Sequence, residues 1–227
     1  MAKRFATGGD LQSSPPLERP LKNDLVFYTD AKATESGAWI GGFKQGPDGK
    51  ITAWFSEEIS SSWAPWLHLK RDPKRIIAAL ELLASLVAVK LWMPPTGEAS
   101  DATCWIRGST DNQSNTYAIS RWMSTKFPLT VFIMELSESL RLSRCNLTLD
   151  WIPRESNQLA DDLTNEKFDH FEQEDRVRWD PTQQSWHVLD EFMLHANSFH
   201  TEMTKRKSEP QAPPAKKRKK TSSLEPW

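Results

Sequence analysis

Three short apolar runs near the start of the chain predict β-strands. They cover residues 25–29 (LVFYT), 38–43 (AWIGGF) and 51–55 (ITAWF), and they are rich in aromatic and β-branched residues, which is typical of buried strands. The stretch QGPDG at 45–49 is a turn signal. A similar turn at 35–37 (ESG) precedes the second run. The pattern therefore predicts an antiparallel meander of three strands.

The rest of the apolar pattern alternates between helices and strands. Residues 76–89 are almost continuously apolar, and they lie between Asp72-Pro73 and Pro94-Pro95, which predicts one long helix over 74–92. The elements predicted after it are a strand at 102–110, a short helix that begins at the capping residues near 111, a helix at 128–143, a strand at 146–152 and a helix at 156–165. This order predicts an α/β fold with a mixed five-stranded sheet, in which two parallel strands extend the meander, and with helices on both faces.

Composition divides the chain into four segments. Residues 1–22, with Gly-Gly, Ser-Ser and three prolines, are expected to be disordered. Residues 23–165 form the predicted domain. Residues 166–204 are acidic and aromatic, and we expect an extension that packs on the domain. Residues 205–227 are rich in lysine and proline, and they predict a disordered basic tail.

Charge is distributed unevenly along the chain. Residues 1–204 hold 21 Lys/Arg against 28 Asp/Glu, a net charge of −7, whereas residues 205–220 hold eight Lys/Arg against one acid. The tail contains a basic cluster after a proline-rich spacer, which is a candidate nuclear import signal or nucleic-acid tether; a solvated charge run is the alternative. The cluster consists of Lys216, Lys217, Arg218, Lys219 and Lys220.

These features predict a nuclear protein, or otherwise a cytoplasmic one. The start of the chain shows no signal peptide, and no apolar run reaches the length of a membrane span, so we expect no membrane association. The two cysteines, Cys104 and Cys145, form neither a disulfide framework nor a zinc motif.

Four acids stand where a carboxylate is structurally awkward. Glu81 lies in the apolar stretch IIAALELLASLVAV, where an unpaired charge is costly to bury. Asp30 ends the first predicted strand, Asp111 follows the fourth, and Asp161 lies among apolar positions of the last helix. The first and fourth strands are expected to be parallel neighbours, so their carboxyl ends share one edge of the sheet. We expect the four carboxylates to converge there.

Divalent cations would offset the repulsion between these acids. Mg²⁺ prefers oxygen ligands, and two ions can activate a water molecule and stabilise a leaving oxygen. Each acid could also have a purely structural role. Asp30 could cap a strand end or belong to a turn, and Glu81 could face solvent or pair with Arg107. Asp111 could be a helix N-cap. Asp161 could lie on a solvated helix face, and Asp162 competes with it.

Four motifs carry a resemblance to a known family. They are FYTDAK at 27–32, LELLA at 80–84, STDNQS at 109–114 and WIPRESNQLADDLTN at 151–165. In this order they resemble the ribonuclease H domain of retroelement reverse transcriptases, of the long-terminal-repeat and tyrosine-recombinase types. The resemblance covers about residues 24 to 165.

The resemblance implies a ribonuclease H-like fold and a two-metal endonuclease that cuts the RNA strand of RNA–DNA hybrids. Asp30 would bridge two Mg²⁺ ions, with Mn²⁺ as an alternative. Glu81 and Asp111 would hold one ion and Asp161 the other. The expected partners are an RNA–DNA hybrid, a reverse transcriptase domain and, from the basic tail, an import receptor.

Contacts to nucleic acid are predicted at two places. Asn112, Ser114 and Asn115 begin a helix that could hold phosphate oxygens. Trp63 and Trp66 could stack on sugars or bases, or instead pack over the long helix.

The chain also departs from the family. The stretch IPRES lacks the histidine of many cellular ribonucleases H, and no basic helix follows the long helix. The net charge of the body argues against tight unaided binding of a hybrid. Two other functions therefore stay open: an inactive nucleic-acid-binding or docking module, and another nuclease on the same fold.

Overall fold

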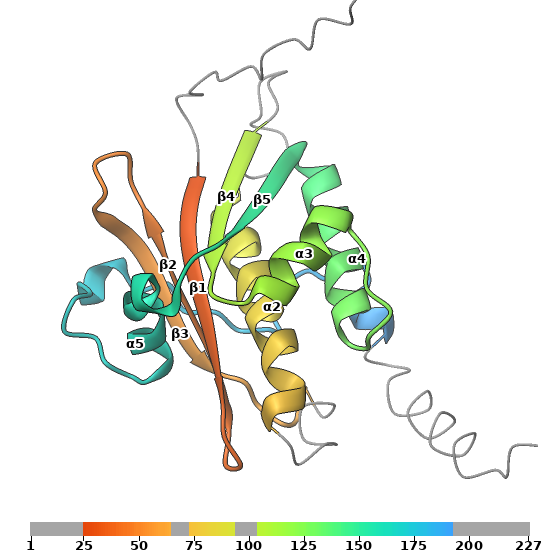
Figure 1. Ribbon diagram of the computed structural model, residues 1–227, viewed down its shortest axis with the longest axis horizontal. Coiled ribbons are helices and arrows are strands. Elements are labelled where there is room, and N and C mark those ends of the chain that lie inside the picture. The colour runs from red at the N-terminus through yellow and green to blue at the C-terminus, as the bar shows by residue number, and fades with distance from the viewer. Residues whose placement is uncertain (1–24, 65–72, 94–103, 193–227) are drawn as a thin grey trace, which may run out of the picture.

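The computed structural model describes residues 25–64, 73–93 and 104–192 (Figure 1). The predicted disordered segment 1–22, residues 193–204 of the extension and the basic tail lie outside these residues. The described elements are β1 (Leu25–Ala33), β2 (Ala38–Gln45), β3 (Ile51–Glu58), α2 (Pro73–Trp92), β4 (Cys104–Thr110), α3 (Gln113–Arg121), α4 (Leu129–Leu142), β5 (Cys145–Trp151), the 3₁₀ turn η1 (Arg154–Ser156), α5 (Gln158–Thr164) and the 3₁₀ turn η2 (Gln173–Asp175).

The five strands form one mixed sheet in the order β3-β2-β1-β4-β5. β1 pairs antiparallel with β2, and β2 pairs antiparallel with β3. β4 lies parallel to β1 on its other side, and β5 lies parallel to β4. The prediction of a three-stranded meander extended by two parallel strands is confirmed.

Helices cover both faces of the sheet (Figure 1). α2 packs on β1 and β2 and also contacts α4, which packs on β5. α5 packs on β1, β2 and β3 from the opposite face. Two separate hydrophobic clusters result. The larger one contains Phe27, Phe55 and most of α2, and the smaller one contains Phe43, Trp54 and Leu163. The predicted placement of helices is therefore also confirmed.

The strand ends differ from the sequence prediction at one point that matters for function. β1 does not end near Asp30 but continues to Ala33, because residues 30–33 still pair with β2. Its pairing with β4 stops earlier, at Tyr28 and Ser109. In the sequence, the apolar aromatic run stops before Asp30, which predicts a strand end. Backbone pairing with β2 nevertheless extends the strand through residues 30–33, which include Asp30 and Lys32. One side of β1 thus lacks a strand partner from Asp30 onward.

The segment after α5 runs along the outer strand β3 and contributes to both clusters. Phe171 packs in the smaller cluster against Trp54, with ring centroids 5.4 Å apart. The backbone N–H of Val177 then donates to the Trp54 carbonyl at 2.7 Å. Trp179 and Trp186 belong to the larger cluster on the other face. The segment therefore covers an edge strand that would otherwise expose unpaired backbone groups.

A buried ion pair fixes the end of this segment. The Lys90 ammonium of α2 lies 2.6 Å from the Glu135 carboxylate of α4, and both side chains are buried. Glu135 also accepts the backbone N–H groups of His187, Val188 and Leu189. The carboxylate therefore joins α2, α4 and the C-terminal segment.

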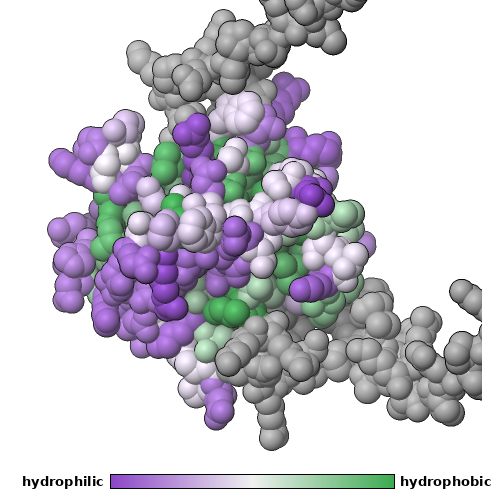
Figure 2. Space-filling model, in the orientation of Figure 1, coloured by the Kyte–Doolittle hydropathy of each residue, from purple (hydrophilic) through white to green (hydrophobic). Residues whose placement is uncertain are grey.

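Among the described helices, none has the length and apolar character that a bilayer crossing requires. On the face shown in Figure 2, hydrophilic residues gather over the half that carries α5, and apolar residues are more frequent toward α4.

Candidate metal centre

Three of the four predicted acids meet at the open side of β1. Carboxylate oxygens of Asp30, Glu81 and Asp111 all lie within 4.8 Å of one another. The three residues come from β1, from α2 and from the position directly after β4. Because the β1–β4 pairing stops at Tyr28, α2 can direct the Glu81 side chain toward the side of β1 that no strand covers. The convergence predicted from strand order is present for these three residues.

Two of these carboxylates are buried without a salt bridge. Asp30 and Glu81 are each only 7% exposed. Thr164 donates its hydroxyl to Asp30 at 3.2 Å, and Thr110 donates its hydroxyl to Glu81 at 3.4 Å. Within the described ranges, no salt bridge joins either acid to a lysine or arginine. The alternative pairing of Glu81 with Arg107 is therefore wrong, since the Arg107 side chain is exposed on β4.

Burial and mutual repulsion perturb both groups. Burial, followed by the charges of Asp111 and Asp161, raises the pKa of Asp30 to about 7. Burial, followed by the charges of Asp111 and Asp30, raises the pKa of Glu81 to about 8. Desolvation and a nearby like charge both disfavour ionisation. A bound cation would supply the missing charge, and a cluster of carboxylate oxygens is the donor set that Mg²⁺, Mn²⁺ and Ca²⁺ prefer. The residues therefore fit a divalent metal ion.

Asp161 lies beside this group but outside it. It lines the same cleft of about 300 Å³ as Asp30, Glu81 and Asp111. Its oxygens are held by other partners: Arg154 donates to Oδ1 at 3.1 Å, and Asn165 donates to Oδ2 at 3.0 Å. The structure thus brings three of the predicted acids together and holds the fourth next to them.

The competing acid, Asp162, is not among the residues that line the cleft. Its carboxylate accepts a hydrogen bond from Gln158 at 3.1 Å and lies 3.8 Å from the Lys167 ammonium. Of the two neighbouring acids, the geometry favours Asp161.

A glycine lets α5 approach the sheet closely enough to contribute to the cleft. A Cβ atom at Gly41 would lie 2.8 Å from the Cβ of Leu163 and 3.3 Å from atoms of Thr164. Thr164 is the residue that donates to Asp30. The small residue on β2 therefore sets the distance between α5 and the acid cluster.

The N-terminus of α3 is not capped by Asp111. Asn112 is the N-cap, and its side-chain oxygen accepts the N–H of Asn115 at 3.2 Å. The Asn112 side chain also forms a hydrogen bond with Glu81. Asp111 is therefore available to the acid cluster rather than to the helix cap.

Two of the residues predicted to contact nucleic acid have packing partners within the protein. Asn115 is only 1% exposed, and its amide donates to the Ala78 carbonyl at 2.9 Å, so it joins α3 to α2. Trp63 packs against Trp179 and Trp186, with ring centroids 5.7 and 5.9 Å away. This packing partner comes from the C-terminal segment, which local sequence around Trp63 does not reveal.

The other predicted contacts are in different positions. Ser114 is exposed in the first turn of α3. Trp66 and the basic cluster at 216–220 lie outside the described residues, so those predictions stay predictions.

Two residues near the acid cluster were not predicted from the sequence. Arg154 lines the cleft from η1. Trp151, at the end of β5, is 50% exposed and donates its indole N–H to the Asp111 carbonyl at 3.0 Å. Both lie at or just beyond the carboxyl end of β5, where α/β sheets commonly place their sites. That rule, applied to β5 as well as to β1 and β4, would have identified them.

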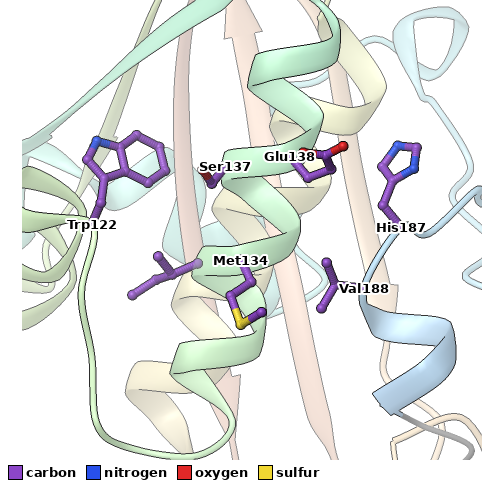
Figure 3. Close-up of a pocket in the computed structure, with 7 residues that line it drawn as sticks. Trp122, Met134, Ser137, Glu138, His187 and Val188 are labelled. Atoms are coloured by element: carbon purple, nitrogen blue, oxygen red, sulfur yellow. The ribbon is translucent and has the colours of Figure 1, made fainter.

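A second and larger cavity lies away from the acids. It has a volume of about 570 Å³ and lies against α4, between Trp122 and the His187–Val188 segment (Figure 3). Glu138 is the one carboxylate among its lining residues, and it is paired with Arg141 at 2.7 Å. The residues that line this cavity do not include a cluster of metal ligands. The smaller cleft that contains Asp30, Glu81 and Asp111 is therefore the candidate site.

Comparisons with known proteins found similarity at the level of structure. No protein-family model matches the chain, and no curated protein matches it either. RNase H1 from the halophilic archaeon Halobacterium salinarum NRC-1 is 20% identical, with a TM-score of 0.46 over 64% of this chain and 98% of the other. LC11-RNase H1, isolated from compost and solved in complex with an RNA/DNA hybrid, is 20% identical, with a TM-score of 0.47 over 64% of this chain and 97% of the other.

A third similar structure is the N-terminal RNase H domain of a Mycobacterium tuberculosis protein. It is 17% identical, with a TM-score of 0.46 over 65% of this chain and 94% of the other. The fold class of this protein is defined by its own strand order and pairing. Its activity has to be inferred from the candidate site.

Proposed function

We propose that this protein is a divalent-metal-dependent endonuclease that cleaves the RNA strand of RNA–DNA hybrids. One observation carries the proposal. Carboxylate oxygens from β1, α2 and the end of β4 lie within 4.8 Å of one another, and two of the three acids are buried. Because such a cluster is costly without a cation, its presence supports a metal-binding role rather than a structural one.

Asp30, Glu81 and Asp111 would hold the metal, and Asp161 would join them for a second ion. Bound Mg²⁺ would supply activation of the attacking water and stabilisation of the leaving oxygen of the phosphodiester. The hydroxyls of Thr164 and Thr110 orient two of the carboxylates. This supporting layer is typical of sites in which the orientation of the ligands matters.

The choice of an RNA–DNA hybrid as substrate is supported by the four motifs of the sequence, FYTDAK, LELLA, STDNQS and WIPRESNQLADDLTN. The same motifs support a retroelement origin and a reverse transcriptase domain as partner. The basic cluster at 216–220 supports nuclear import through a receptor. A fusion of residues 205–227 to a fluorescent protein tests that proposal, and an exclusively cytoplasmic signal would contradict it.

Cleavage of an end-labelled RNA–DNA hybrid tests the enzymatic proposal. We expect the wild-type chain to cut the RNA strand with Mg²⁺ or Mn²⁺ and not with EDTA, leaving 5′-phosphate and 3′-hydroxyl ends. Asp30→Asn should abolish cleavage. Asp169→Asn, which removes an exposed carboxylate after α5, should retain it and serves as the matched control.

Absence of metal-dependent cleavage by folded wild-type protein would overturn the proposal. Competition with single-stranded RNA, double-stranded RNA and double-stranded DNA separates a hybrid-specific enzyme from another nuclease on this fold. Hybrid binding that persists without turnover, and that Asp30→Asn leaves unchanged, would instead favour an inactive binding module.

A further inference from the structure

Asp161 has a different environment from the three acids that it adjoins. Arg154 donates to its Oδ1 at 3.1 Å, and Asn165 and Gln158 donate to its Oδ2 at 3.0 and 3.4 Å. Asp30 and Glu81 have only hydroxyl and amide donors and no salt bridge within the part of the chain that is described, and the charge of Arg154 reaches Asp30 and Asp111 only without direct contact. The fourth carboxylate is therefore already neutralised by an internal cation.

This ion pair competes directly with a metal ion. A carboxylate oxygen that accepts from a guanidinium has less capacity to ligate a cation, and the positive charge of Arg154 repels a cation approaching Asp161. The arginine and a second metal ion are therefore alternative partners for the same carboxylate.

The arginine is the partner that can leave. The side chain of Arg154 is 76% exposed, whereas that of Asp161 is 22% exposed. α5, which carries Asp161, is fixed to the sheet at both ends. The Asn157 amide donates to the Thr29 carbonyl at 3.0 Å, and the Ser56 hydroxyl donates to the Leu163 carbonyl at 2.7 Å. A rotation of the Arg154 side chain thus frees Oδ1 of Asp161 without moving the helix.

A phosphate group is the anion best suited to take the guanidinium away. Arg154 lines the same cleft as the three clustered acids, so a phosphodiester bound there would lie within the arginine's reach. Guanidinium groups bind phosphate oxygens with paired hydrogen bonds. Substrate would therefore remove the competitor of the second metal ion as it binds.

We infer that Arg154 is a positioning residue that holds Asp161 out of the metal site until a phosphate group engages its guanidinium. Binding of the second divalent ion is thereby coupled to binding of the substrate. The inference rests on the proposed function, in which Asp161 is a metal ligand. It predicts that the free protein binds one divalent ion and gains the second only with nucleic acid present.

Metal titration of the full chain without nucleic acid tests this coupling. Mn²⁺ binding, followed by electron paramagnetic resonance of the free ion, should give one site for the wild type and a second site for Arg154→Ala. The affinity of the second site should rise on the order of tenfold or more, because one repelling charge is removed. Arg154→Lys, which keeps the charge, should resemble the wild type.

Two further variants separate this mechanism from a general charge effect. Arg141→Ala removes an exposed arginine that is paired with Glu138, and it should leave the Mn²⁺ isotherm unchanged. The double variant Arg154→Ala/Asp161→Asn should lose the second site. Identical isotherms for wild type and Arg154→Ala, or a second site that persists without Asp161, would overturn the inference.

Hybrid cleavage provides the second readout. Arg154→Ala should reach half-maximal rate at a lower Mg²⁺ concentration than the wild type, while its KM for the hybrid rises because the phosphate contact is lost. If the wild type does not cleave at all, the proposed function fails, yet the Mn²⁺ titrations still decide whether Arg154 competes for Asp161. If the wild type cleaves and the titrations show no difference, the coupling alone fails.

Discussion

Replacing Asp30 by asparagine should stabilise the metal-free protein at alkaline pH. Asp30 is 7% exposed, and burial together with the charges of Asp111 and Asp161 raises its pKa from an ordinary 3.8 to about 7. A group whose pKa is higher in the folded state stabilises the fold fully below its unfolded pKa, and this stability is lost as the pH rises through the folded pKa. The wild-type protein in EDTA should therefore lose stability between about pH 4 and pH 8.

The size of the effect follows from the two pKa values. The difference between 3.8 and about 7 corresponds to an upper limit of about 4 kcal/mol at high pH. Asparagine retains an acceptor for the Thr164 hydroxyl but loses part of the hydrogen-bond strength, so a net gain of about 1–3 kcal/mol is expected. For a domain of this size that gain raises Tm by roughly 2–10 °C.

Thermal unfolding in EDTA at pH 5 and pH 8 measures this effect. Asp30→Asn should match the wild type within about 1 kcal/mol at pH 5 and exceed it at pH 8, where the wild-type carboxylate is charged. Asp169→Asn, on an exposed loop, controls for the loss of one negative charge. Addition of Mg²⁺ should raise the Tm of the wild type and not that of Asp30→Asn, since binding to the folded state stabilises it.

One outcome would refute this reasoning. If Asp30→Asn were destabilised equally at pH 5 and pH 8, the carboxylate would have to be stabilised in the folded protein rather than strained by it. The acid cluster would then be an ordinary hydrogen-bonded part of the core, and nothing in its energetics would require a metal ion.

Other predictions test the site and its support. The Mg²⁺-induced rise in Tm should be larger at pH 8 than at pH 6, because the buried acids must lose their protons before they ligate a cation. Trp151→Ala should weaken hybrid binding by about 1–3 kcal/mol in a polarisation assay if the ring stacks on nucleic acid. Trp105→Ala, the half-exposed tryptophan at the opposite end of β4, should not. Gly41→Ala should cost about 1–3 kcal/mol in urea unfolding, because the added methyl overlaps Leu163. Lys90→Met should cost about 3–5 kcal/mol in the same assay by leaving Glu135 buried and unpaired.

Three of the acids could be predicted because each conflicts with its local sequence. Glu81 interrupts an apolar helix, Asp30 ends an apolar run, and Asp111 stands between a predicted strand and the start of a helix. A carboxylate in such a place is costly unless something pairs with it, so the conflict itself indicates a function. The order of the strands then placed these residues at one edge of the sheet, and the structure has them within 4.8 Å.

The residues that the sequence did not reveal lie where no such conflict exists. Trp151 is the last residue of β5, and Arg154 lies in the short polar stretch that follows it. The packing partners of Trp63 could not be predicted either, because Trp179 and Trp186 are more than 100 residues away in sequence. Local patterns carry no information about contacts of that range.

Packing elsewhere in the protein can offset the destabilisation that the buried acids cause. The buried acids Asp30 and Glu81 weaken the metal-free protein at neutral pH, and this cost has to be offset by packing elsewhere. The C-terminal segment supplies such packing: Trp179 and Trp186 join the larger cluster, and Phe171 joins the smaller one. Because burial of an aromatic side chain contributes about 2–3 kcal/mol, the segment can outweigh the strain of the acid cluster. A domain boundary placed directly after the last motif, at residue 165, would remove that contribution and leave the site on a weakened scaffold.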